Sequence, residues 1–178
     1  MKFEMTDEQI VAGCIQKNPI AQQRLYDKFA KKMMGVCLRY CDNQYEGEDI
    51  LQNGFISVFE NIKSYRGTGS LEGWVRKIII NTALTNIRKT KKLKHNVDLD
   101  SVEFALVDTN YLGDNFAAKE LLKVIQSLPI GFRTVFNLHA IEGYSHKEIG
   151  EMMGISEGTS KSQYSRAKIH LQKIIKVD

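Results

Sequence analysis

Lysine and arginine are concentrated in two stretches of this 178-residue chain that contain no acidic residue. Residues 76–94 hold seven Lys or Arg, and residues 161–176 hold five. Clustered cations of this kind bind the phosphates of nucleic acid, because neutralising a phosphate releases condensed counterions. Residues 95–114 instead carry five acidic residues and no Lys or Arg, so a polyanion repels them. The pattern predicts two DNA-contacting modules joined by an acidic linker.

The positive stretch at residues 76–94 belongs to a predicted helix that begins at Leu71. Polar residues recur there at three- and four-residue spacing, so they share one helical face. These residues are Lys77, Asn81, Thr85 and Arg88. Such a stripe is often only a solvated face. Here no acid lies nearby to pair with the cations, which favours a surface that contacts phosphates and bases.

The second basic stretch follows a pattern typical of a helix-turn-helix. Ser145–Glu148 is a capping box that begins a short helix, Gly154 suits a tight turn, and Ser156 caps a longer helix. A recognition helix must bring donors into the major groove near its N-terminal end. The alternative is a plain helical hairpin in a bundle. The polar residues that face outward are Lys161, Ser162, Ser165 and Arg166.

Apolar residues recur at helical spacing in almost all other segments, which predicts an all-α fold. Thr6 and Gln9 form a capping box before the first helix, and Pro19 begins the second. Two glycines, Gly67 and Gly69, predict a loop before the basic helix. We expect two small domains, an N-terminal helical bundle and a C-terminal helix-turn-helix bundle. Further helices are expected from about Glu46, over 115–128 and over 132–142.

The composition indicates a soluble, cytoplasmic protein without membrane insertion. The net charge is +4 and 43% of residues are hydrophobic, but no apolar run approaches the roughly 20 residues that a bilayer requires. Residues 1–10 lack the features of a signal peptide. Cys14, Cys37 and Cys41 are expected to be free thiols, and we expect no metal and no cofactor.

No combination of residues suggests catalysis. The sequence shows no nucleophile elbow, phosphate loop or metal-ligand cluster. His139, His146 and His170 suit phosphate contact or surface exposure better than acid–base work. We therefore expect a binding protein and assign no catalytic residue.

Four motifs in register resemble those of a known family. The motifs are DILQNGF at 49–55, LEGWVRKIIINTA at 71–83, SLP at 127–129 and GYSHKEIG at 143–150. Their order and spacing are similar to regions 2 and 4 of the extracytoplasmic-function (ECF) sigma factors, members of the sigma-70 family of bacterial RNA polymerase initiation factors. The resemblance implies region 2 over residues 1–93, the acidic linker over 94–114 and region 4 over 115–178.

The resemblance also implies partners and site residues. The partners are core RNA polymerase, through its β′ clamp coiled coil and β flap, promoter DNA, and an anti-sigma factor. The clamp would contact Asp49, Gln52 and Asn53. The separated strand of the minus-ten element would contact Tyr65, Arg66, Lys77, Asn81, Thr85 and Arg88. The duplex minus-thirty-five element would contact Thr159, Lys161, Ser162, Ser165 and Arg166.

Two other classes of protein remain open at this point. One is an autonomous helix-turn-helix repressor whose residues 1–92 sense a signal or dimerise, although no heptad seam is visible. The other is a DNA-processing enzyme such as a recombinase, whose catalytic cluster the N-terminal part does not supply. Only a sigma factor requires stable binding to core polymerase.

The acidic linker has more apolar residues than a solvated spacer requires, Phe104 and Leu106 among them. We expect part of it to dock between the two modules when polymerase is absent and to cover promoter-reading surface. The alternatives are a plain spacer and a mimic of RNA in the exit path of the polymerase.

Overall fold

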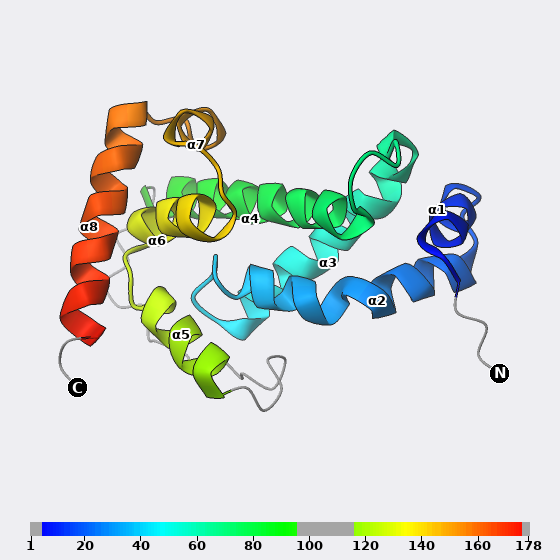
Figure 1. Cartoon of the computed structure of the whole chain (residues 1–178), viewed down its shortest axis with the longest axis horizontal. Helices are drawn as coiled ribbons and strands as arrows, with labels where there is room; N and C mark the ends of the chain where they lie inside the picture. Colours follow the sequence, from blue (N-terminus) through cyan, green and yellow to red (C-terminus); the bar gives the residue numbers. More distant parts are fainter. Residues whose placement is uncertain (1–4, 96–115, 176–178) are drawn as a thin grey trace.

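The computed structural model describes residues 5–95 and 116–175, which form helices joined by short loops (Figure 1). These ranges contain no β-strand, which confirms the predicted all-α fold of two helical domains. Most of the acidic linker lies outside the described residues. The expectation that the linker docks between the two modules therefore concerns residues that the structure does not describe. The elements are α1 (Asp7–Ile15), α2 (Pro19–Cys37), α3 (Gln44–Asn61), η1 (Ile62–Ser64), α4 (Leu71–His95), α5 (Phe116–Gln126), α6 (Ile130–Phe136), η3 (Asn137–Ile141), α7 (His146–Met153) and α8 (Glu157–Ile175).

Helices α1 to α4 form an N-terminal bundle around one apolar core. Leu25, Phe29 and Met33 recur every fourth residue on α2 and are buried against α3 and α4. Gly54 lets α3 lie close to α4, because a Cβ atom at this position would stand 2.4 Å from the Cδ1 atom of Ile79. This close packing fixes α4, which carries the first basic stretch.

The starts of the helices are capped as the sequence predicts. The Thr6 side chain accepts a hydrogen bond from the Gln9 amide, and the Gln9 side chain accepts one from Thr6 in return. Asn18 caps α2 ahead of Pro19, and the Ser70 hydroxyl accepts from the Gly73 amide at the start of α4. Each cap satisfies an amide that the first helical turn leaves unbonded.

Helices α5 to α8 form a C-terminal bundle that contains the predicted helix-turn-helix. The Ser145–Glu148 capping box begins α7, and Gly154 ends it with a φ of 68°, a left-handed conformation that suits glycine. Gly150 packs closely under the turn, where a Cβ atom would lie 2.7 Å from the carbonyl oxygen of Ile155. These features place α8 across α7 with its first turns exposed.

The predicted helix over 132–142 differs from the observed one. Helix α6 begins earlier, at Ile130, directly after Pro129, and its last turn widens into the π-helical turn η3. The Glu142 amide donates to the Asn137 carbonyl five residues back. Such wide turns are rare and frequently occur at functional positions. This one directs Asn137 and Glu142 toward the N-terminal bundle.

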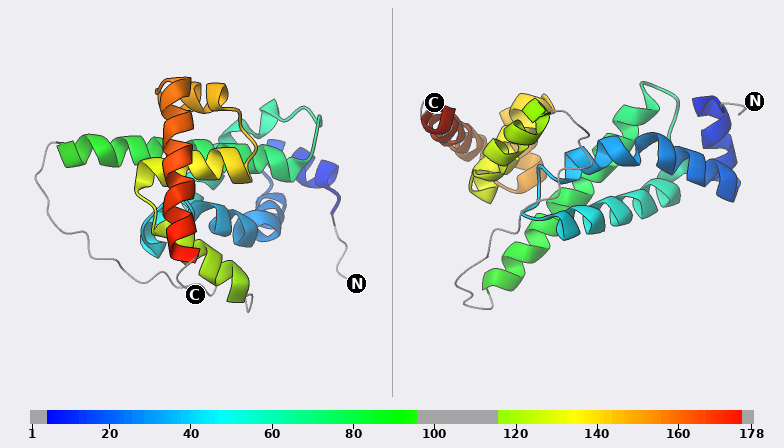
Figure 2. Two further views of the ribbon diagram at one scale, coloured as in Figure 1. Left: turned by 60° about the vertical axis from the view of Figure 1, so that its left-hand side comes forward. Right: turned by 90° about the horizontal axis from the view of Figure 1, so that it is seen from below.

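The two bundles are in direct contact (Figure 2). The larger apolar cluster contains Leu122, Val135, Leu138 and Ile149 together with the core of the N-terminal bundle. The backbones of helices in different bundles nevertheless come close to each other at fewer places than the backbones of helices within one bundle. Side chains therefore make most of the contact.

Candidate nucleic-acid interface

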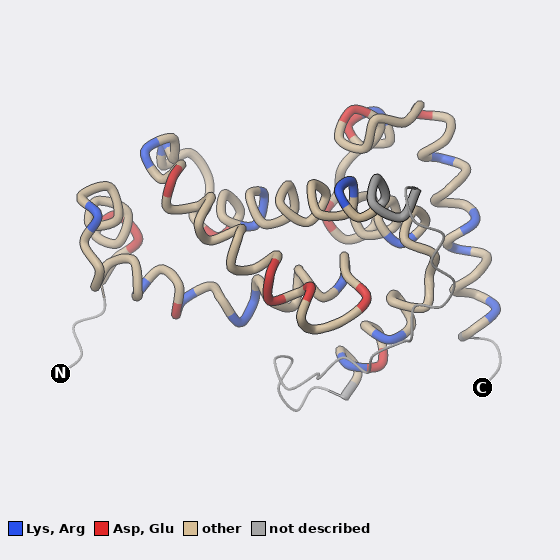
Figure 3. The backbone as a smooth tube through the Cα atoms, turned by 180° about the vertical axis from the view of Figure 1, so that it is seen from behind, with Lys and Arg blue, Asp and Glu red and all other residues tan. Residues whose placement is uncertain are grey.

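The predicted polar stripe of α4 is present and exposed. Lys77, Asn81, Thr85 and Arg88 are all solvent-exposed. The Thr85 hydroxyl donates to the Asn81 carbonyl at 2.9 Å, which leaves its oxygen free to accept from a base or sugar. Figure 3 shows Lys and Arg positions recurring along this helix.

The loop before α4 is more ordered than a glycine-rich segment suggests. Gly67 and Gly69 have φ angles of 71° and 85°, which turn the chain sharply. The Tyr65 ring lies 5.6 Å from the Trp74 ring, and its hydroxyl donates to the Gly69 carbonyl at 3.0 Å. Tyr65 is therefore half-buried and holds the loop closed, whereas Arg66 is exposed. Trp74 packs against the core, as its spacing indicates.

A polar groove of about 520 Å³ runs between α3 and α4. Its lining includes Asn81 and Thr85 of the predicted minus-ten face. It also includes Asn53, which the family resemblance assigned to the polymerase-binding residues. Sequence reasoning missed the other polar side chains of its walls. Their four-residue spacing on each helix is the signal that could have identified them. They are Ser57, Asn61, Thr82, Asn86 and Lys89.

A second groove, of about 1160 Å³, lies between α2 and α3. Asp49 and Gln52 line it and are exposed, so α3 separates these two residues from Asn53. Tyr26 and Ile56 add exposed apolar surface that the sequence reasoning did not identify. Helix α3 itself carries four acids and no Lys or Arg. Its exposed face therefore suits a basic partner with apolar anchor residues.

The predicted minus-thirty-five residues lie together near the start of α8. Thr159, Lys161, Ser162, Ser165 and Arg166 are all exposed. Lys161 forms a 2.6 Å ion pair with Glu157, which is a weak contact because both side chains are solvated. The opposite face packs through Ala167 and Leu171, whereas Ile174 is 36% exposed.

Comparison with known proteins identifies the family of this chain. Family models for sigma-70 region 2 and sigma-70 region 4 match residues 25–93 and 118–171. The ECF RNA polymerase sigma factor SigW of Bacillus subtilis is 31% identical over 161 residues, which cover 84% of this chain and 86% of that protein. The chain belongs to the ECF sigma factors. The resemblance seen in the sequence is thus confirmed.

Two further proteins are similar over most of this sigma factor. The ECF RNA polymerase sigma-E factor of Haemophilus influenzae is 26% identical over 179 residues, covering 94% of each chain. The sigma factor RpoE of Bartonella quintana, solved in complex with the anti-sigma factor NepR, superimposes with a TM-score of 0.59. It is 20% identical and covers 88% of this chain, so it supports the fold alone. The two family models and the ECF relatives of Bacillus subtilis and Haemophilus influenzae favour a sigma factor over an autonomous repressor.

The histidines of region 4 form a packed cluster. The His139 and His146 rings stack with centroids 4.1 Å apart, and Tyr164 lies edge-on to His139 at 4.7 Å. His139 Nδ1 donates to the Tyr144 carbonyl, and His146 Nδ1 is hydrogen-bonded to the hydroxyl of the buried Ser160 at 2.9 Å. Two of the three histidines expected on the surface therefore brace the helix-turn-helix, and only His170 is exposed.

Acidification should destabilise this cluster. Burial, followed by the positive fields of His139 and Lys161, lowers the pKa of His146, with Glu157 opposing. Below about pH 6.5 the unfolded chain therefore binds more protons than the folded chain. The folded state loses stability as the pH falls through this range. We expect a lower unfolding temperature at pH 5.5 than at pH 7.5 by circular dichroism. His146→Gln should show less of this pH dependence than His170→Gln, and equal dependence in both would contradict the assignment.

The cysteines and acids of the described residues suggest no metal centre. Cys14, Cys37 and Cys41 are free and buried. No group of three or more His, Cys, Asp or Glu capable of holding a metal occurs in the described part of the chain. Among its helices, none is long and apolar enough to cross a membrane.

Proposed function

We propose that this sigma factor binds core RNA polymerase through α3, stabilises the melted minus-ten element with α4 and reads the minus-thirty-five element with α8. The observation that carries the proposal is the presence of a region 2 match and a region 4 match in one chain, each with an exposed polar face on the expected helix. We divide the chain into region 2 over 1–93, the acidic linker over 94–114 and region 4 over 115–178.

The α2–α3 groove suits the β′ clamp coiled coil. Asp49 and Gln52 supply charge and hydrogen bonding at its edge, while Tyr26 and Ile56 supply apolar surface within reach. Interfaces of this kind combine a few apolar anchors with a polar rim. Asn53 lines the α3–α4 groove, so it would contact the clamp only if the clamp extends across α3 toward that groove.

The α3–α4 groove and the Tyr65–Ser70 loop suit a separated DNA strand. Unpaired bases offer hydrogen-bonding edges, which the amides Asn53 and Asn81 can recognise, and flat faces that stack on aromatic rings. The Tyr65 ring of the loop, which packs against Trp74 of α4, offers an aromatic surface for such stacking. Stacking is worth roughly 1 to 3 kcal/mol per base. Binding energy alone would thus favour the open promoter, with no catalytic step.

The start of α8 suits the major groove of duplex DNA. Lys161 and Arg166 can donate to guanine, and the hydroxyls of Thr159 and Ser162 can contact bases or phosphates. Region 4 would also meet the β flap of polymerase. Because polymerase and promoters are its partners, we propose that the protein acts in the cytoplasm. A related sigma factor is bound by an anti-sigma factor, and we propose such a partner here.

Core polymerase binding tests the proposal. Asp49→Ala combined with Gln52→Ala should lower affinity for core polymerase by about tenfold, because central interface residues carry most binding energy. Stability should change by less than about 0.5 kcal/mol per site, as expected for exposed positions. Affinity is measured by fluorescence anisotropy and stability by urea unfolding.

Glu60→Ala is the matched control, since Glu60 is an exposed acid of the same helix that does not line the α2–α3 groove. It should bind core polymerase like the parent. A double variant that binds normally would show that this face is misassigned. A parent protein that fails to bind core polymerase at all would overturn the proposed function.

A further inference from the structure

A carboxylate of region 4 is enclosed by two arginines of region 2. The Glu142 side chain is 5% exposed. Arg76 donates to it from Nε at 2.6 Å and from Nη2 at 2.7 Å, and Arg39 donates from Nη2 at 2.8 Å. The hydrogen bonds to Glu142 raise the pKa of Arg76, whereas burial lowers the pKa of Arg39. Without Glu142, two guanidinium groups would face each other with no carboxylate between them.

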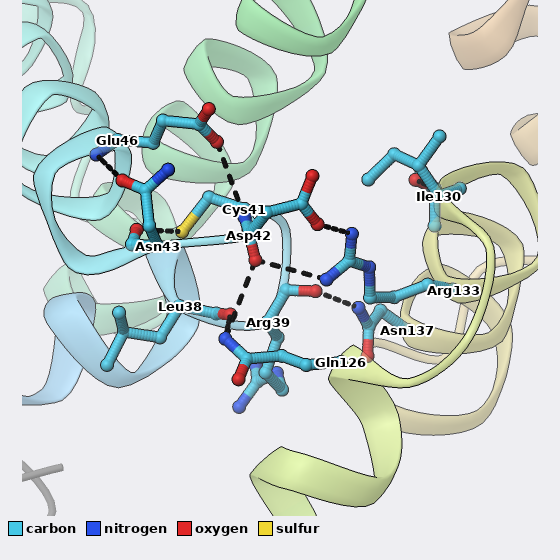
Figure 4. Close-up of polar contacts among 11 residues, drawn as sticks. Leu38, Arg39, Cys41, Asp42, Asn43, Glu46, Gln126, Ile130, Arg133 and Asn137 are labelled. Atoms are coloured by element: carbon cyan, nitrogen blue, oxygen red, sulfur yellow. Dashed lines mark hydrogen bonds and ion pairs between the residues drawn. The ribbon is translucent and has the colours of Figure 1, made fainter. Parts of the chain in front are cut away.

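Three more side chains of region 4 bond the backbone just beyond the end of α2 (Figure 4). Helix α2 ends at Cys37, so the carbonyls that follow need partners from outside the helix. Arg133 is 1% exposed and also pairs with the Asp42 carboxylate. Gln126 donates to the Leu38 carbonyl at 2.8 Å, Asn137 donates to the Arg39 carbonyl at 2.8 Å, and Arg133 donates to the Cys41 carbonyl at 3.1 Å.

The contact is polar and incompletely paired. Among the described residues, five buried side-chain polar atoms have no hydrogen-bond partner in the protein, and four of them lie at this contact. They are Arg39 Nε, Tyr40 Oη, Arg133 Nε and Asn137 Oδ1. Buried polar groups without partners oppose burial, which weakens an interface that is otherwise rich in charge-assisted hydrogen bonds. Such an interface can open, unlike a fully apolar core.

The same contact places α7 against the DNA-facing side of α4. The Arg88 guanidinium donates to the Met152 carbonyl at 2.5 Å. The pKa of Glu148 is lowered mainly by hydrogen bonds to Ser145 and further by the positive charge of Lys77. Of the cations assigned to the minus-ten strand, Arg88 is therefore hydrogen-bonded to region 4, and Lys77 lies close enough for its charge to act on the Glu148 carboxylate.

The closed arrangement cannot read both promoter elements at once. Elements named minus ten and minus thirty-five are separated by about 25 base pairs, or roughly 85 Å at 3.4 Å per base pair. A compact chain of this length has a radius of gyration of about 16 Å. The regions must therefore separate before both elements can be bound.

We propose that Glu142, Arg133 and Asn137 latch region 4 onto region 2 in the free chain, and that the closed latch excludes the melted minus-ten strand from α4. This inference rests on the proposed function for its DNA arm, whereas the latch itself is a property of the free protein. Core polymerase opens the latch because it binds the separated regions more favourably than the closed form.

Distances between spin labels test the latch. Lys63→Cys and His170→Cys place exposed thiols in region 2 and region 4. The native thiols compete poorly for label because they are buried, and burial raises the pKa of Cys37 to about 12. In the labelled full chain, we expect one narrow distance distribution. Glu142→Gln should broaden it toward longer distances, and so should Arg76→Ala, which removes the partner instead.

Glu151→Gln is the control, because it removes one exposed carboxylate from α7 outside the contact. It should retain the narrow distribution. A broad distribution in the parent, or no broadening in either latch variant, would overturn the proposal. Circular dichroism identifies a variant that has unfolded, in which case the other latch variant decides. Core polymerase should lengthen the distance in the parent, and its failure to bind would count against the proposed function and leave the latch intact.

Binding of a single-stranded oligonucleotide tests the exclusion of DNA. If the open form makes up only about one-tenth of the free chain, a change that makes it the dominant form raises the apparent affinity for DNA about tenfold. We expect this increase for Glu142→Gln over Glu151→Gln, measured with a fluorescent minus-ten strand in the absence of polymerase. A variant that opens without gaining affinity would show that the latch does not cover the DNA-binding face.

Discussion

Replacing both Lys161 and Arg166 by alanine should weaken binding of the holoenzyme to a duplex minus-thirty-five element by about 100-fold, since each side chain that contacts a base edge contributes roughly 1 to 3 kcal/mol. Both residues are exposed near the start of α8, whereas its packed face lies opposite. The fold should therefore be unaffected. Electrophoretic mobility shift at fixed salt measures the change, because salt alone alters such affinities strongly.

Lys173→Ala is the matched control, because it removes one charge from the last turn of the same helix. It should reduce affinity only slightly. On a promoter whose minus-ten segment is already separated, the Lys161 and Arg166 changes should matter less, while Asn81→Ala and Arg66→Ala should matter more. Equal defects of all variants on both templates would contradict the division between α4 and α8.

Gly150→Val should unfold the helix-turn-helix, with a loss of about 3 kcal/mol, because overpacking a site that cannot relax costs this much. A Cβ atom at this position meets the Ile155 carbonyl at 2.7 Å, and a backbone carbonyl cannot rotate away. Urea unfolding should show the loss. Duplex binding should fall with it.

Gly158→Val provides the comparison in the same motif. A Cβ atom there has only the Ser156 hydroxyl at 3.8 Å, so the larger side chain has room. This variant should remain folded to within about 1 kcal/mol. If both variants retain parental stability, the turn between α7 and α8 is less tightly packed than the structure shows.

Local features of the fold could be predicted from the sequence. Capping boxes depend on residues three apart, so Thr6 with Gln9 and Ser145 with Glu148 identified the starts of α1 and α7. The exposed faces of α4 and α8 followed from helical periodicity in the same way. Such signals require no knowledge of distant parts of the chain.

Contacts between distant residues could not be predicted. Glu142 meets Arg39 and Arg76 across the two regions, and no periodic pattern relates these positions. A π turn has the same apolar spacing as an α-helical turn over so short a length, so 132–142 was predicted as one helix. The sequence also does not show that Trp74 lies beside Tyr65 and half-buries its ring.

The division of residues between grooves was also beyond the sequence. Asp49, Gln52 and Asn53 share an exposed side of α3, but neighbours on both flanks decide which groove each one lines. Only the packing of α2 and α4 separates Asn53 from the other two. Its assignment to the polymerase face therefore stays a prediction.

Run-off transcription with core polymerase on a library of genomic promoters tests the central claim most directly. The purified chain should direct initiation from a limited set of promoters that share two elements at fixed spacing, and Asp49→Ala with Gln52→Ala should reduce every transcript. Core polymerase alone should give none of these transcripts. If the folded chain adds no specific transcript above that background, it is not acting as a promoter-directing initiation factor.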